Sequence, residues 1–242
     1  MKSRRHSLYI IIFLLLGSTL QWNCYKDLDC HNEKVGESYL DESTKAFIPL
    51  DTSKALVFKN ALGDEMRFVC RNPSFQRLDL EQEVICIQVN LSFNYKYVGS
   101  DYWVLPYQQD SIYAEEVRMS FIVRTKSVSP FAVKVGDKLP FYDWFEARLG
   151  FNLAGSGDAT INYVVSQRDS DAGDLAEATA AQAYRAIADT TILGKQFTDV
   201  LASVPGFGTQ PDEHYSLLYQ KNVGPVAFST KSGTVYVFDR VE

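Results

Sequence analysis

The strongest structural signal in this chain is the stretch Val84-Ile85-Cys86-Ile87-Gln88-Val89-Asn90-Leu91-Ser92-Phe93-Asn94-Tyr95-Lys96-Tyr97. From Ile85 to Phe93 every second residue is apolar, whereas several of the residues between them are polar. A period of two is typical of a β-strand that buries one face. The sequence therefore predicts a strand over 84–97 and a protein built mainly from strands.

Two other regions contain apolar runs that are separated by turn residues. Near the start, runs at 54–60 and 65–70 flank a Gly-Asp pair at 63–64, which predicts a β-hairpin. Near the end, Gly-Lys at 194–195 separates two runs, and three more runs follow. We therefore expect a mainly β fold, with α+β as the alternative, in which an antiparallel meander forms a curved sheet, a sandwich or a barrel.

One segment departs from the strand pattern. Residues 174–189 are rich in alanine, which is the strongest helix former. We expect at most one short helix, around 174–189, covering one face of the sheet. The alternative for this segment is a pair of strands with small side chains.

The first 23 residues have the layout of a secretory signal peptide. Basic residues precede an apolar run at 8–16, which is shorter than the roughly 20 residues that a transmembrane helix needs. Cys24 follows, at the place where a lipoprotein signal positions the cysteine that receives the lipid. We expect residues 1–23 to be removed and Cys24 to be lipidated, with ordinary cleavage nearby as the alternative.

The rest of the chain is long enough for one sizeable domain. Residues 24–45 are mostly polar, which predicts a lipidated cysteine followed by a linker, and we expect a single β-rich domain over 46–242. Hydrophobic residues make up 46% of the chain and aromatic residues 13%, a composition that excludes a disordered protein.

Composition also restricts the partners and the chemistry. The formal net charge is −6 and no cluster of Lys or Arg forms a stripe, which argues against nucleic acid. Beyond the signal, His31 and His214 are the only histidines, and no phosphate-binding or nucleophile motif is present. The sequence therefore predicts no metal, no cofactor and no identifiable catalytic residue.

The cysteines are consistent with an exported protein, in which disulfides persist. If Cys24 carries lipid, Cys30, Cys70 and Cys86 remain, which permits one disulfide and leaves one thiol. Cys70 and Cys86 lie in consecutive apolar segments and form the first candidate pair. Cys30 bonded to either of them is the alternative.

Aromatic residues cluster within 141–145 after a proline. Exposed rings serve as binding platforms because they offer large contact area at low entropic cost. The candidate ligand-binding surface consists of Phe141, Tyr142, Trp144 and Phe145. The alternative is that these rings belong to the core.

Both ends of the chain resemble a broad group of Bacteroidota-type lipoproteins, in which a lipidated cysteine precedes an antiparallel β domain. The residues that carry the resemblance are Phe47-Ile48-Pro49-Leu50, Leu56-Val57-Phe58-Lys59-Asn60 with Gly63-Asp64, Gly194-Lys195-Gln196-Phe197-Thr198-Asp199-Val200, and Leu218 to Phe228 with Gly233. The resemblance implies a palmitate-type lipid anchor and a location at the outer membrane, in the periplasm or exposed at the surface. It implies no catalytic residue.

Two functions are compatible with these features. The first is a noncatalytic domain that binds an envelope protein or a glycan, or supports the envelope, and that contacts the membrane through its N-terminal lipid. The second is a hydrolase of envelope polymers or glycans that uses two carboxyl groups.

Overall fold

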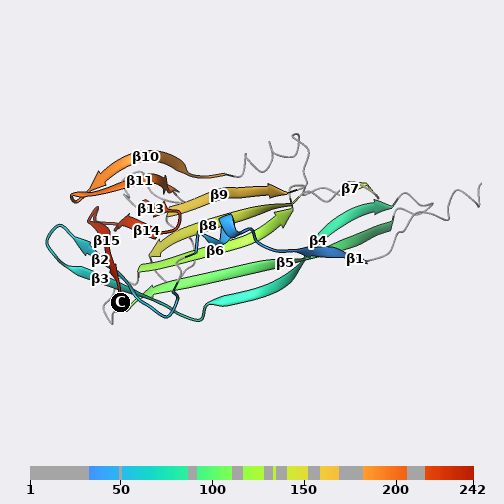
Figure 1. Cartoon of the computed structure of the whole chain (residues 1–242), viewed down its shortest axis with the longest axis horizontal. Helices are drawn as coiled ribbons and strands as arrows, with labels where there is room; N and C mark the ends of the chain where they lie inside the picture. The colour runs from blue at the N-terminus through green and yellow to red at the C-terminus, as the bar shows by residue number, and fades with distance from the viewer. Residues whose placement is uncertain are drawn as a thin grey trace, which may run out of the picture.

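The computed structural model shows an elongated molecule whose longest strands run along its long axis (Figure 1). It describes residues 33–48, 51–86, 92–110, 117–127, 133–134, 141–151, 159–168, 182–205 and 216–242. The first described strand lies toward one end of the molecule, and the C-terminus lies near the other (Figure 1). The signal segment and Cys24 lie outside the described residues.

The described residues form a single sheet of 15 strands and one short helix. The elements, in chain order, are β1 (Glu33–Ser38), α2 (Glu42–Lys45), β2 (Leu56–Asn60), β3 (Glu65–Cys70), β4 (Ser74–Cys86), β5 (Ser92–Gln109), β6 (Val117–Ser127), β7 (Val133–Lys134), β8 (Phe141–Phe151), β9 (Ala159–Arg168), β10 (Arg185–Ile192), β11 (Lys195–Ala202), β12 (Val204–Pro205), β13 (Ser216–Gln220), β14 (Gly224–Ser229) and β15 (Val235–Val241).

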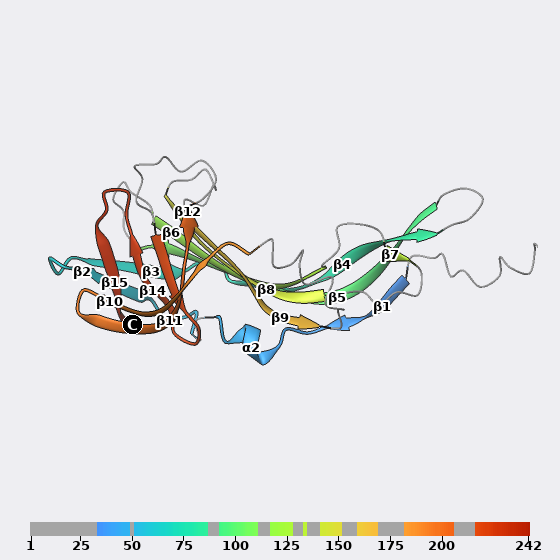
Figure 2. The same cartoon turned by 90° about the horizontal axis from the view of Figure 1, so that it is seen from above.

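The sheet is antiparallel except where β1 pairs with β5 and β7 pairs with β4. Its strand order is β10-β11-β13-β14-β15-β2-β3-β5-β6-β8-β9-β12, with β1, β4 and β7 off this path. Figure 2 shows that the sheet curls strongly into a half-barrel at one end and extends as an arm at the other. The prediction of a mainly β fold with a curved antiparallel sheet is confirmed.

Strand β5 connects the arm to the curled part. Its residues 92–104 pair with β4 and its residues 107–109 with β3, while residues 102–108 pair with β6. Because residues 102–104 pair with β4 and β6 at once, these two partners lie on opposite edges of β5. One strand therefore determines the register of both parts of the sheet.

The predicted continuous strand over 84–97 is wrong in one respect. Strand β4 ends at Cys86, β5 begins at Ser92, and these two residues are antiparallel partners. The chain therefore changes direction between β4 and β5, and residues 87–91 lie outside the described residues. The alternation indicated strand conformation correctly, but no glycine or proline marked the reversal.

The core lies inside the curl of the sheet and consists largely of aromatic rings. Along β6, the side chains at odd positions are buried and those at even positions are partly exposed. The fully buried side chains include the rings of Phe58, Phe68, Tyr107, Phe121, Phe145, Tyr219 and Phe228. Each buries a large apolar area, so the core is stabilised mainly by the hydrophobic effect and by edge-to-face ring contacts.

Residues 33–48 pack on this sheet, although we expected 24–45 to be a linker. Strand β1 pairs with β5, and α2 contacts β8 and β9 (Figure 2). Phe47 inserts its ring against Phe145, at 4.7 Å between centroids, and its carbonyl accepts a hydrogen bond from the Tyr219 hydroxyl. The polar composition of this segment reflects its exposed face and did not reveal these contacts.

The carboxylate of Asp143 anchors α2. This side chain is fully buried, and it accepts hydrogen bonds from the Asp41 backbone N–H at 3.0 Å and from the Thr44 hydroxyl at 2.8 Å. The Thr125 hydroxyl donates to its other oxygen at 3.3 Å. The carboxylate therefore satisfies donors at the start of α2, which has no side-chain cap of its own.

The predicted helix over 174–189 is wrong for residues 185–189, which belong to β10. The remaining residues up to 181 lie outside the described residues. Strand β10 pairs with β11 around a two-residue turn of Leu193 and Gly194, both at positive φ. Such a turn matches the twist of an antiparallel pair, and this tertiary pairing outweighs the helix preference of alanine.

We predict that Asp143→Ala lowers the free energy of unfolding by about 2–4 kcal/mol, because it leaves buried donors without an acceptor. Urea denaturation measures this loss. Asp189→Ala is the matched control, since Asp189 is exposed on β10, and it should change stability by less than about 0.5 kcal/mol. Equal effects of the two substitutions would show that Asp143 does not anchor α2.

Candidate functional site

Strands β5, β6 and β8 have a second face on the side of the sheet opposite the core. On β8 the side chains of Phe145, Ala147 and Leu149 enter the core, so the residues between them point to the other side. Charged and aromatic side chains gather there, and we call this group the outer-face cluster. It consists of Tyr102, Arg124, Lys126, Trp144, Glu146 and Arg148.

Glu146 is the only acidic member of the outer-face cluster, and its side chain is 5% exposed. The Arg148 guanidinium donates a hydrogen bond to it through Nε. A second guanidinium nitrogen, Nη2 of Arg124, lies 3.7 Å from its other oxygen. One buried carboxylate thus holds two arginines, whose side chains remain 34% and 45% exposed.

Lys126 is the third cation of the cluster. Its ammonium lies over the ring of Trp144, with Nζ 3.7 Å from the ring centroid, which is a close cation–π contact. Tyr142 packs edge-on against the same indole at 5.8 Å between centroids. Among the described residues, no carboxylate forms an ion pair with Lys126. The cluster therefore has three cations for one anion.

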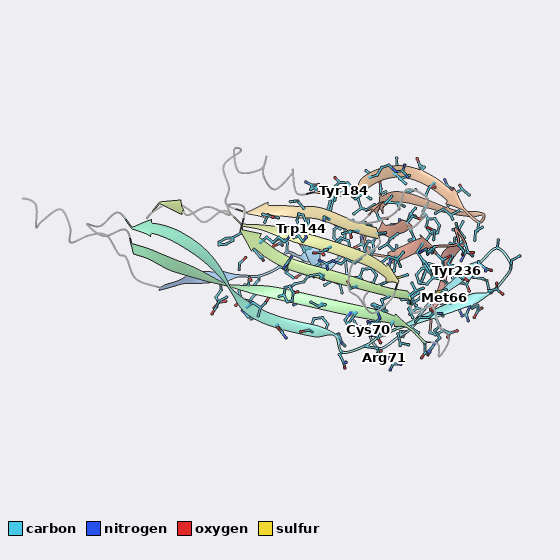
Figure 3. All side chains as sticks on the ribbon, turned by 180° about the vertical axis from the view of Figure 1, so that it is seen from behind. Met66, Cys70, Arg71, Trp144, Tyr184 and Tyr236 are labelled. Carbon is cyan, nitrogen blue, oxygen red and sulfur yellow. The ribbon has the colours of Figure 1, made fainter. Side chains whose placement is uncertain are left out.

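Two buried donors in the cluster lack a hydrogen-bond acceptor within the described part of the chain. They are Nε of Arg124 and Nε1 of Trp144, and the Trp144 side chain is only 2% exposed. Buried polar atoms in folded proteins are almost always satisfied, so an unsatisfied donor calls for an explanation. Figure 3 shows Trp144 remote from Met66 and Tyr236 at the curled end.

Burial lowers the pKa of the Lys126 ammonium to about 8. The positive charge of Arg124 adds to this lowering, whereas the negative charge of Glu146 opposes it. Both effects have the usual physical origin, because a low-dielectric surrounding and a like charge disfavour the protonated form. An anion placed beside Lys126 would restore its charge.

The aromatic residues of the candidate ligand-binding surface are buried, which agrees with the alternative that they belong to packed parts of the protein. Phe141 is 9% exposed, Tyr142 5%, Trp144 2% and Phe145 0%. They also divide between two faces, because Phe145 joins the core whereas Tyr142 and Trp144 pack on the outer face with Val164. The four rings therefore form no common binding platform, and only Trp144 belongs to the candidate site.

Cys70 has a free thiol, so the expected disulfide with Cys86 is not formed. The register explains why. Cys70 pairs with Tyr107 and Cys86 with Ser92, two positions that lie 15 residues apart on β5. That separation is roughly 50 Å, whereas a disulfide requires Cα atoms within about 7 Å. The alternative disulfide with Cys30 involves a residue outside the described ranges.

The two buried carboxylates among the described residues lie on opposite faces of β8. Asp143 points to the side covered by α2, and Glu146 belongs to the outer-face cluster. A glycosidase needs its two carboxyl groups on one cleft, so this pair cannot act together. In the described part of the chain, no group of three or more His, Cys, Asp or Glu side chains could hold a metal ion.

The members of the cluster that the sequence analysis missed are Arg124, Lys126, Glu146 and Arg148. A signal for them was present in the sequence. Arg124 and Lys126 are two residues apart within one strand, as are Glu146 and Arg148, so the two members of each pair share a face. What the sequence did not reveal is that β6 and β8 are neighbours, which brings the two pairs together.

Comparisons with protein-family models, with curated proteins and with solved structures find no match to this chain. None of the helices in the described residues is long and apolar enough to cross a membrane.

We predict that Cys70 reacts with an alkylating reagent in denatured protein that has not been reduced. Burial raises the pKa of its thiol in the folded state, so labelling before denaturation should be slow. Peptide mass spectrometry after labelling with one reagent before reduction and a second after it reports the result. Labelling of Cys70 only after reduction would mean that it is bonded to another cysteine.

The lowered pKa of Lys126 predicts a pH-dependent contribution to stability. Between pH 8 and about 10.5 the unfolded chain binds more protons at this residue than the folded chain, so stability increases as pH rises through this window. Urea denaturation from pH 7 to 10 should show the native chain gaining stability relative to Lys126→Met. A difference between the two that is independent of pH would contradict the lowered pKa.

Proposed function

We propose that this chain is a lipid-anchored domain of the bacterial cell envelope that binds a ligand without catalysing a reaction. The observation that carries the proposal is the outer-face cluster, in which one buried carboxylate holds two arginines beside a lysine that forms no ion pair with a carboxylate of the described residues. A rigid sheet presents these groups, which favours recognition of a ligand over a mobile catalytic arrangement.

The placement of the chain ends supports a tethered domain. A lipid on Cys24 would precede β1 by only a few residues, and β1 lies toward the arm end of the elongated molecule (Figure 1). The curled part would then project away from the membrane. Two or more acyl chains anchor a soluble domain stably, because each buried methylene contributes about 0.8 kcal/mol. The proposed location is the outer membrane.

The buried carboxylates favour binding over hydrolysis. Asp143 is committed to α2 and Glu146 to the two arginines. Because they lie on opposite faces of β8, neither supplies an acid–base partner to the other. The hydrolase alternative therefore has no carboxyl pair to use among the buried acids of the described residues.

We predict that Cys24→Ala releases the protein from the membrane fraction, because the acylation site is lost. Fractionation of cells, with a salt wash of the membrane pellet and mass spectrometry of the mature N-terminus, measures this. Cys70→Ala is the matched control and should remain in the pellet. If Cys24→Ala stays in the salt-washed pellet, the lipid-anchor proposal is wrong.

A further inference from the structure

We propose that the outer-face cluster binds a polymer that carries carboxylate groups, such as a polyuronate chain. This inference rests on the proposed function, since it names the ligand class of the same site.

The cluster has an excess of two positive charges. Arg124, Lys126 and Arg148 supply three cations, and Glu146 neutralises one of them. The chain as a whole has a net charge of −6, so this excess is a local feature and not a property of the whole surface. A partly buried cation without a counter-charge is unfavourable, and an anionic ligand would relieve that cost.

The arginines are already arranged to receive an anion. A guanidinium has five N–H donors, and Glu146 uses only part of this capacity in either arginine. Their side chains are 34% and 45% exposed, so the remaining donors can reach a ligand. Because Glu146 holds both groups in place, little side-chain entropy is lost on binding.

Carboxylate is the anion that this arrangement fits. A guanidinium binds a planar carboxylate with two parallel hydrogen bonds, and both arginines already interact with the carboxylate of Glu146. A carboxylate of the ligand would add a second contact of this kind, on the exposed side of the two guanidinium groups.

The spacing of the cations favours a polymer over a small anion. Lys126 of β6 pairs with Tyr142, which lies six residues before Arg148 on β8, so the backbone positions of these two cations are roughly 20 Å apart along the strands. A single carboxylate cannot reach both positions, whereas a chain with a charge on each unit can. Several weak contacts along one polymer increase its affinity through effective concentration.

Neutral sugars do not fit this face in the same way. A sugar ring stacks on an exposed aromatic surface, but the Trp144 side chain is 2% exposed and Lys126 covers its ring. Recognition at this site therefore depends on charge and not on stacking.

The test measures binding of the full chain, purified in detergent, to polygalacturonate by isothermal titration calorimetry. We expect polygalacturonate to bind, and its affinity to fall as the salt concentration is raised, because salt screens the attraction between the cations of the cluster and the carboxylates of the polymer. Dextran, a neutral polymer, should not bind. Galacturonate monomer should bind about tenfold or more weakly than the polymer, per uronate unit.

The variant Arg124→Gln/Glu146→Gln/Arg148→Gln removes the guanidinium groups without leaving a buried carboxylate unpaired. We expect it to lose about tenfold or more in affinity, the equivalent of one charge-assisted hydrogen bond. Arg185→Gln is the matched control, because it changes the net charge of the chain by the same amount at an exposed position on β10. Thermal unfolding verifies that each variant is folded.

Lys126→Met provides a second variant that retains both arginines, and it should also weaken binding. Equal affinity of the native chain for polygalacturonate and dextran would overturn the inference. So would an affinity that the triple variant and Lys126→Met leave unchanged, or binding to anionic phospholipid vesicles in place of polygalacturonate. Each of these results leaves the lipid anchor to be judged by the fractionation of Cys24→Ala, so the two failures are distinguishable.

Discussion

The pairing of β5 holds the two parts of the sheet together. This one strand of 18 residues pairs with β1, β3, β4 and β6, so it sets the register of the arm and of the curled part together. A shift of one residue would move every side chain of β5 to the other face. Burial of Leu105 and Tyr107 on one face prevents such a shift, because both side chains are fully buried in the core.

The same alternation produces a second face with a different chemistry. The core side is filled by aromatic rings, and the N-terminal segment covers part of it. Phe47 of this segment packs on Phe145, and the backbone N–H of Asp41 donates a hydrogen bond to Asp143 of β8. The opposite side carries the outer-face cluster, where an indole, three cations and one carboxylate share a small area. A stiff sheet therefore keeps charged groups in a fixed arrangement that loops would not maintain.

Strand conformation could be predicted well from the sequence, and the pairing of the strands less well. The hairpin between β2 and β3 and the meander at the C-terminal end lie where turn residues predicted them. The reversal within 84–97 was missed because no turn residue marks it, and β10 was mistaken for part of a helix because of its alanine content. The candidate surface at 141–145 was wrong, since aromatic content does not distinguish a buried ring from an exposed one.

The fold class could be predicted from the sequence, because a period of two and well-placed turn residues act locally and require no knowledge of which strands are neighbours. Which strands lie side by side is seen only in the folded chain. That arrangement brought Arg124 and Lys126 of β6 next to Glu146 and Arg148 of β8, and it placed Cys70 far from Cys86. The physical reason is that contacts between strands join residues distant in the chain, whereas the conformational preference of a residue depends only on its neighbours in the sequence.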